Sequence, residues 1–80
     1  MAVKTNELAF IIRDHRKKAG LTQKALADIA GLGKTVIFDI EKGKDTVQFS
    51  SLLKVLKALN IKLKIESRLM EREVIINEES

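Results

Sequence analysis

The stretch from Thr22 to Gly43 decides the fold, and it reads TQKALADIAGLGKTVIFDIEKG. Two short segments with apolar residues at helical spacing flank the linker Gly31-Leu32-Gly33. Thr22 is a good N-cap because its hydroxyl can accept a bond from a free amide of the first turn, and glycine suits the left-handed residue that ends a helix. The stretch therefore predicts helices over about residues 23–30 and 34–42, joined by a tight turn as in a helix-turn-helix unit.

Two further helices are expected around this stretch. Apolar spacing predicts one over about residues 6–19, capped by Thr5 or Asn6 and ended by Gly20, and one over about residues 49–59, ended by Asn60. The residues expected to face the core are Leu8, Ile11, Ile12, His15, Ala19, Leu26, Ile29, Ala30, Leu32, Ile37, Ile40, Phe49, Leu52, Leu53, Leu56 and Leu59.

The period of the apolar residues changes after Asn60. Residues 61–66 alternate strictly between apolar and charged, which predicts a strand. A second strand at Val74-Ile75-Ile76 is a weaker alternative because its flanks are acidic. A lone strand leaves its edges unpaired, so we expect the strand to pair with its copy in a homodimer, through a face of Ile61, Leu63 and Ile65.

The sequence thus predicts an all-α fold of four to five helices plus one C-terminal strand that pairs across a dimer. Its expected divisions are a helical domain in residues 1–60, a dimerisation strand in residues 61–67 and an acidic tail in residues 68–80.

Charge is distributed unevenly along the 80 residues, whose net charge is +4. Fourteen Lys and Arg against seven Asp and Glu give residues 1–68 a charge of +7, whereas one against four gives residues 69–80 a charge of −3. A basic body suggests a polyanion as partner, although an ordinary solvated lysine surface is an equal alternative. No apolar run is long enough for a signal peptide or membrane span, so we expect a cytoplasmic protein, on the nucleoid when bound to DNA.

Catalysis, metals and cofactors find no support in the sequence. There is no cysteine, and the single histidine, His15, lies on a helical stripe, so neither a metal site nor a nucleophile with a base is expected. Gly31-Leu32-Gly33-Lys34-Thr35 is only superficially similar to a phosphate-binding loop, because Asp28 stands where the first glycine is required. We therefore expect no enzyme, no cofactor and no metal.

The motif T-Q, L-A-x-x-A-G-L and I-E-x-G in the opening stretch resembles the Cro/repressor-type (Xre) helix-turn-helix family of prokaryotic and phage DNA-binding proteins, and the resemblance covers about residues 8–59. It implies a lambda-repressor-like fold in which the helix after the glycine turn lies in the major groove. The residues at the N-terminus of this helix suit base edges. Lys34 can donate to guanine, Thr35 can hydrogen-bond a donor or an acceptor on a base edge, and Val36 can contact thymine methyls. The resemblance adds Phe38 and Asp39 as base contacts.

Two positions depart from the family pattern. Gly33 stands where a polar cap is usual, and Phe38 stands where a small polar residue is common. Phe38 either meets a thymine methyl, packs on a neighbouring subunit or is partly buried between helices. Asp39 either accepts a bond from a cytosine amine or lies only on the rim.

The same resemblance implies further roles. Gln23 is expected to bind a backbone phosphate, and Arg16 and Glu41 to form a structural pair between the first and third helices. Other expected phosphate contacts, each of which is otherwise an ordinary surface residue, are Lys24, Lys42, Lys44 and Arg13.

A narrower resemblance concerns the run GKTVIFDIEKGK followed by LLKVLKALNIKLKIES, which is similar to the HipB-like antitoxins of toxin–antitoxin operons. It implies a homodimer that represses its own operon by binding double-stranded operator DNA and that also binds a HipA-like serine/threonine kinase toxin. The alternative is a stand-alone Xre-type regulator with no toxin partner.

Overall fold

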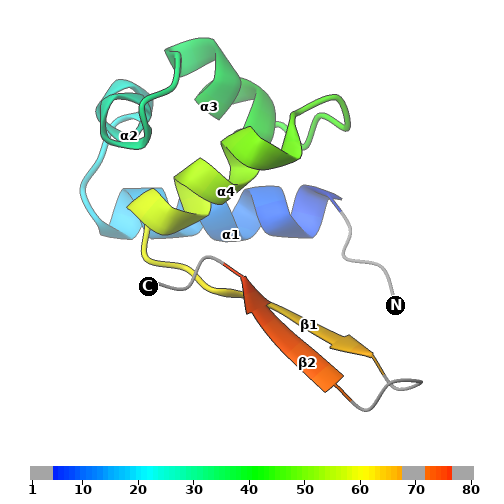
Figure 1. Ribbon diagram of the computed structural model, residues 1–80. Helices are drawn as coiled ribbons and strands as arrows, with labels where there is room; N and C mark the ends of the chain where they lie inside the picture. The colour runs from blue at the N-terminus through cyan, green and yellow to red at the C-terminus, as the bar shows by residue number, and fades with distance from the viewer. Residues whose placement is uncertain (1–4, 68–71, 77–80) are drawn as a thin grey trace.

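Four helices are followed by two strands (Figure 1). The computed structural model describes residues 5–67 and 72–76, with the side chains of residues 7–64. Among the described residues, no helix has both the length and the apolar character needed to cross a membrane. The elements are α1 (Thr5–Lys18), α2 (Gln23–Ala30), α3 (Lys34–Glu41), α4 (Phe49–Ala58), β1 (Leu63–Ser67) and β2 (Arg72–Ile76).

The helix boundaries follow from local cap chemistry. The hydroxyl of Thr22 accepts a hydrogen bond of 3.0 Å from the amide of Ala25 and so caps α2. Gly31 ends α2 with φ +72°, and Asn60 follows α4 with φ +59°, both in the left-handed region. These residues mark both ends of α2 and the C-terminal end of α4. All four predicted helices are present within one or two residues of the expected ends.

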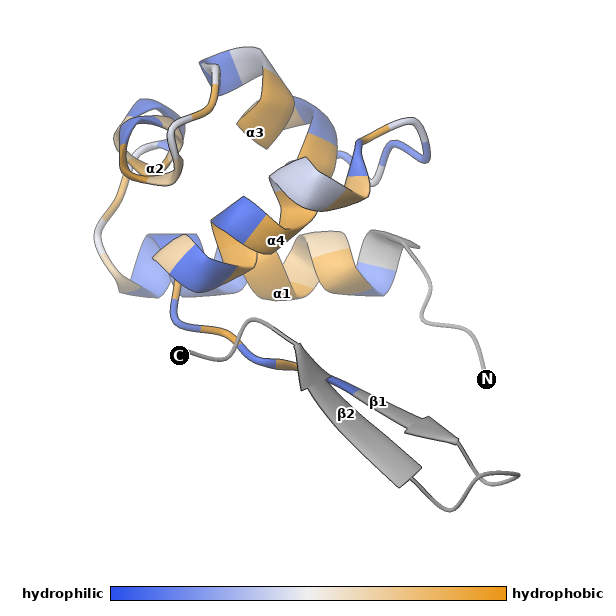
Figure 2. Ribbon diagram, viewed as in Figure 1, coloured by the Kyte–Doolittle hydropathy of each residue, from blue (hydrophilic) through white to orange (hydrophobic). Residues whose placement is uncertain are grey.

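One apolar core lies between the four helices. Its fully buried members are Ile12 of α1, Leu26 of α2, Ile37 of α3, and Val55 and Leu56 of α4. Figure 2 shows that each helix, and the link into β1, contributes apolar residues. The core packs against the side of α3 that carries Ile37 and Ile40, and the opposite side of that helix is exposed to solvent.

The predicted core face of α1 is partly wrong. Ile11 is 41% exposed, and His15 and Ala19 are exposed too, whereas Ala9 and Arg16 are buried. Both sets have helical spacing, and the set with Arg16 faces inward because a carboxylate from α3 meets the guanidinium there.

Two other core predictions are also wrong. Ile29 is 59% exposed on α2, and Phe49 is 55% exposed at the start of α4. Ala27 and Val55 are buried instead. Each exposed residue lies at the edge of its helix's apolar arc, where spacing alone does not decide burial.

The expectation of a single strand without a partner in its own chain is also wrong. β1 pairs with β2 as an antiparallel hairpin, in which Leu63 is opposite Ile76 and Ile65 is opposite Val74. The apolar run in β2 thus satisfies one edge of β1, which its acidic flanks do not prevent. Residues 72–76 of the expected tail form β2, while the rest of the tail, 68–71 and 77–80, lies outside the described residues.

Candidate nucleic-acid interface

The outward side of α3 presents the residues predicted to contact bases. Lys34 and Thr35 are exposed, and Phe38 is 46% exposed, so Phe38 is not buried between helices. Thr35, Phe38 and Lys42 are spaced three and four residues apart, which places them on one stripe opposite the buried Ile37. An α-helix with such a stripe can enter the major groove without disturbing the core.

Val36 and Asp39 lie differently from the others. Val36 is half-buried and packs against the core cluster, away from the outward stripe. Asp39 is half-buried, and its Oδ1 forms an ion pair with Nζ of Lys44 at 3.4 Å. Contacts of these two residues with bases therefore stay predictions.

The N-terminus of α3 has no side-chain cap. Gly33 occupies the cap position with φ −78° and ψ 153°, an extended conformation open to any residue. A Cβ added at Gly33 would meet no atom within 4 Å. The glycine is therefore not required by backbone geometry, and it leaves the first-turn amides of α3 without a competing side chain.

A buried ion pair joins α1 to α3. Arg16 donates to both carboxylate oxygens of Glu41, through Nε at 2.6 Å and Nη2 at 3.0 Å, and donates through Nη1 to the carbonyl of Leu21 at 2.8 Å. The two side chains are only 11% and 4% exposed. The pair predicted from the sequence is thus present, and its bidentate geometry fixes how α3 sits on α1.

Gln23 is attached to the same pair. Its Nε2 donates to Oε1 of Glu41 at 3.2 Å, and an amide nitrogen carries a second hydrogen. Gln23 is the first residue of α2 and half-buried. The structure therefore orients this side chain through Glu41 and leaves a second donor for a phosphate oxygen.

An open hollow of about 240 Å³ lies beside the outward stripe of α3. The Lys42 ammonium lies 5.1 Å from the centroid of the Phe38 ring, a contact that sequence reasoning missed although the residues are four apart on one helix. The hollow thus brings together three of the five predicted phosphate contacts. Its lining residues are Arg13, Arg16, Gln23, Phe38, Glu41 and Lys42.

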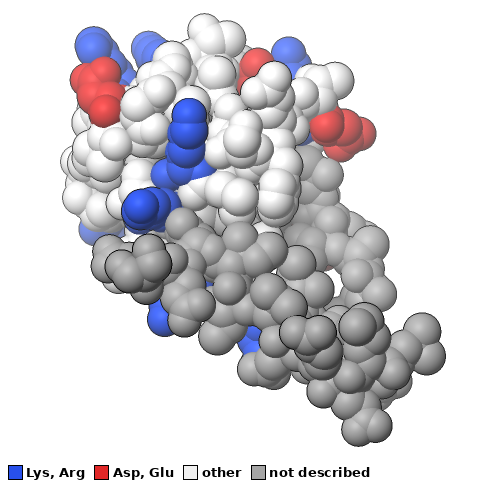
Figure 3. Space-filling view, in the orientation of Figure 1, with Lys and Arg blue, Asp and Glu red and all other residues white. Residues whose placement is uncertain are grey.

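The other two predicted phosphate contacts have acidic neighbours. Lys24 pairs with Asp28 at 3.3 Å, and Lys44 pairs with Asp39 at 3.4 Å. Figure 3 accordingly shows basic and acidic side chains close together above α2 and α3, and basic side chains over α4. A phosphate would have to compete with these surface pairs, which are individually weak.

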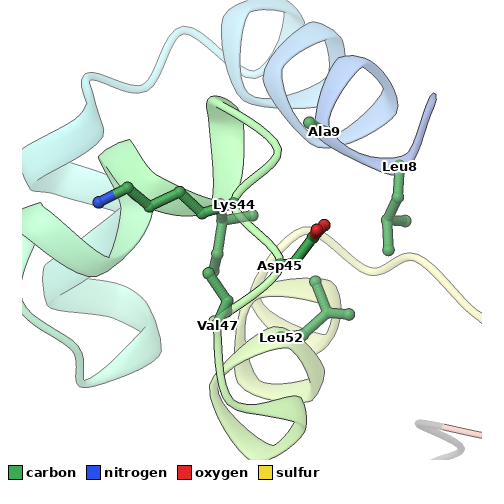
Figure 4. Close-up of a pocket in the computed structure, with 7 residues that line it drawn as sticks. Leu8, Ala9, Lys44, Asp45, Val47 and Leu52 are labelled. Carbon is green, nitrogen blue, oxygen red and sulfur yellow. The ribbon is translucent and has the colours of Figure 1, made fainter. Parts of the chain in front are cut away.

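A second hollow, of about 250 Å³, lies between α1, the α3–α4 loop and α4 (Figure 4). Its lining includes Leu8, Ala9, Val47 and Leu52, and the ammonium of Lys44 points away from it. Elsewhere, Nδ1 of His15 donates to the carbonyl of Ile11 at 2.8 Å. The described residues hold no group of three or more acidic or histidine side chains placed to hold a metal ion.

Known helix-turn-helix proteins share the sequence pattern of this chain. The family model of helix-turn-helix proteins called HTH_3 matches residues 12–65. An uncharacterized HTH-type transcriptional regulator, y4mF of Sinorhizobium fredii, is 37% identical over 59 residues, which cover 74% of this chain and 78% of the relative. Control protein C.SmaI of Serratia marcescens is 35% identical over 72 residues, covering 90% of this chain and 82% of the relative.

Solved structures show the same fold. A structure of the HipA–HipB–O2–O3 complex contains a chain with a TM-score of 0.75 and 22% identity, covering 85% of this chain and 96% of that one. A mutant of the restriction–modification controller protein C.Esp1396I has a TM-score of 0.67 and 28% identity, covering 75% and 78%. Together with the sequence match, these likenesses confirm the predicted helix-turn-helix fold. The chain belongs to the HTH_3 family of helix-turn-helix proteins, a family of DNA-binding transcriptional regulators and not of enzymes.

Proposed function

We propose that this chain is a repressor that binds operator DNA sequence-specifically, with α3 in the major groove. The observation that carries the proposal is the outward stripe of α3, where Lys34, Thr35 and Phe38 are accessible beside a hollow that Arg13 and Gln23 also line. Side chains that can contact bases and side chains that can donate hydrogen bonds to phosphates thus share one surface, as groove binding requires.

Within this proposal the residues divide by chemistry. Lys34 donates to O6 or N7 of guanine, and Thr35 bonds either kind of base edge. Asp39 can accept a bond from a cytosine amine only if its ion pair with Lys44 breaks, so we expect it to contribute less to base contact than Lys34 and Thr35. Val36 ranks last because it packs against the core.

The backbone phosphates are bound by side chains around the hollow. Arg13, Gln23 and Lys42 come from three different helices or their ends and meet there, so they fix the register of α3 on the duplex. Lys24 and Lys44 add contacts at the edges after leaving their acidic neighbours.

We also propose a homodimer, because one recognition helix reads too few base pairs, and two half-sites about 34–36 Å apart supply the rest. The β1–β2 hairpin is the proposed contact, since it extends away from the four helices (Figure 1). The register puts Leu63, Ile65, Val74 and Ile76 at positions on one side of the sheet. Ile61 and Leu63 already pack partly on the core of their own chain, so they contribute less than the strand pattern suggests.

Sedimentation can test the dimer. Ile65→Lys places a charge on the apolar side of the hairpin and should produce a monomer that binds random DNA weakly and lacks operator binding. Lys62→Gln, an exposed position before β1, is the matched control and should remain dimeric. An Ile65→Lys protein that is folded and still dimeric would assign the interface to the helices.

The DNA-binding proposal is tested by selecting bound sites from random duplexes. The expected result is an enriched sequence with two inverted half-sites whose centres are about 10 base pairs apart. Recovery of duplexes without any enriched sequence would reject sequence-specific repression, and absence of binding would reject DNA binding altogether.

The finer proposal is that the chain is the antitoxin of a toxin–antitoxin operon, which represses that operon and neutralises a HipA-like serine/threonine kinase toxin. Its support is the likeness of fold to HipB, as seen in the HipA–HipB–O2–O3 complex. The alternative, a stand-alone regulator without a toxin, is favoured by 35% identity to a control protein over 90% of the chain.

The neighbouring reading frame separates these two candidates. A kinase-like product encoded there should co-purify with this protein and lose kinase activity in the complex. If the neighbouring product is a kinase that neither binds the protein nor is inhibited by it, the antitoxin proposal fails, while repression of the operon remains.

A further inference from the structure

The aromatic ring of Phe38 and the ammonium of Lys42 meet on the outward side of α3. The nitrogen lies 5.1 Å from the ring centroid, within the range in which the negative face of a ring attracts a cation. Phe38 is 46% exposed, so the ring is not committed to core packing. We propose that Phe38 is a positioning residue, whose ring holds the Lys42 ammonium at the hollow so that it binds a backbone phosphate of the DNA.

The hollow suits one phosphate group. Arg13 and Gln23 line it together with Phe38 and Lys42, so three side chains with N–H donors converge where phosphate oxygens can accept. Glu41 lines it too, but its two oxygens accept bonds from Arg16 and Gln23, and the guanidinium offsets its charge. An anion that enters the hollow therefore meets net positive charge.

Lys42 differs from Lys24 and Lys44, the two other lysines proposed to contact phosphates. Lys24 and Lys44 form ion pairs with Asp28 and Asp39, whereas the ion pairs found among the described residues do not include Lys42. A neutral ring can hold an ammonium in place without neutralising its charge. Lys42 is thus held by the ring and not by a carboxylate that would compete with phosphate.

This inference rests on the proposed DNA binding and changes the role expected for Phe38. A side chain that acts through Lys42 contributes equally to all sequences, because phosphates carry no sequence information. A reader of thymine methyls would instead contribute only where thymine is present. The two roles predict different responses to salt and to base composition.

The experiment measures binding of the full chain to a mixed-sequence duplex by fluorescence anisotropy between 50 and 200 mM salt. Lys42→Ala should reduce the log–log salt slope by about 0.9, which is roughly a threefold smaller change in affinity over that range. Phe38→Leu should reduce it equally, since leucine keeps apolar bulk but has no ring. The double variant should match either single one.

Two further variants are the controls. Phe38→Trp keeps an aromatic face and should restore the slope of the natural protein. Lys57→Ala removes an exposed lysine of α4, outside the hollow, and should leave the slope unchanged. Circular dichroism should show that all variants are folded, because each changed side chain is exposed.

Several outcomes would overturn the inference and leave the proposed function intact. An unchanged slope for Lys42→Ala would mean that this ammonium touches no phosphate. An unchanged slope for Phe38→Leu would mean that the ring does not position Lys42. If Phe38→Leu then also abolishes a preference for poly(dA–dT) over poly(dA–dU), the ring reads thymine methyls instead. Failure of the natural protein to bind any duplex would reject the proposed function itself.

Discussion

The side of α3 that faces the other helices carries Ile37, Ile40 and Glu41, whereas the outward side carries Thr35 and Phe38. The inward residues are packed or hydrogen-bonded, and no buried polar side-chain atom of the described residues lacks a partner. The outward residues are exposed. The residues that stabilise the fold and the proposed DNA contacts thus lie on opposite sides of one eight-residue helix, so substitutions should separate stability from DNA binding.

The largest expected effect is on the inward side, at Glu41. Glu41→Ala leaves the guanidinium of Arg16 buried without its counter-charge, which should cost about 3–5 kcal/mol of unfolding free energy. Because a domain of this size has little stability to lose, the variant should be mostly unfolded at 25 °C. Urea denaturation followed by circular dichroism measures the loss.

Glu41→Gln is the companion variant, since it keeps one carbonyl oxygen as an acceptor for Arg16 and Gln23. It should lie between the natural protein and Glu41→Ala in stability. A loss below about 1 kcal/mol for Glu41→Ala would show that the pair behaves like a surface ion pair and that the inward side rests on apolar packing alone.

The next effect is on the outward side, at Lys34. Lys34→Ala should cost about 1–3 kcal/mol of binding free energy on the selected operator, much less on random duplexes, and almost nothing in stability. Anisotropy titrations and thermal melts measure the two quantities, with Lys57→Ala as the exposed control on α4. Equal losses on both kinds of DNA would mean that Lys34 positions α3 and reads no base.

Much of the inward side could be predicted from the sequence, because caps and apolar spacing are local signals. Thr22, Gly31 and Asn60 mark helix ends by their own chemistry, and these helices formed as expected. The burial of Arg16 in place of His15 could not be predicted from the spacing of residues within α1. It depends on Glu41, 25 residues away, as the pairing of β1 with β2 depends on a distant apolar run.

The outward side shows the converse. The residue types that suit DNA could be named from the helix-turn-helix pattern, and Lys34 and Thr35 are exposed as that requires. What the sequence did not predict is which cations are already paired. Lys24 with Asp28, and Phe38 with Lys42, are each four residues apart, so helical spacing could have indicated both contacts. The Lys44–Asp39 pair lies at the end of α3 and depends on side-chain geometry.

A smaller effect is expected in the turn before α3, at Gly31. Gly31→Ala forces a residue with a Cβ to adopt φ +72°, which should cost about 1 kcal/mol of stability. No atom lies within 4 Å of the added Cβ, so the loss should come from the backbone alone. If thermal melts show no loss, the turn has moved to another conformation, and the orientation of α3 should change with it.

The smallest effect is expected at Gly33, two residues on, and its sign is opposite. Gly33→Ser keeps φ −78° without strain, and its hydroxyl can cap the open first turn of α3. The cap and the less flexible unfolded chain should together add about 0.5 kcal/mol, or roughly 2–4 °C in Tm. Gly33→Ala is the matched control, because it restricts the unfolded chain equally but offers no hydroxyl. A serine variant no more stable than the alanine variant would show that the first-turn amides of α3 gain nothing from a side-chain cap.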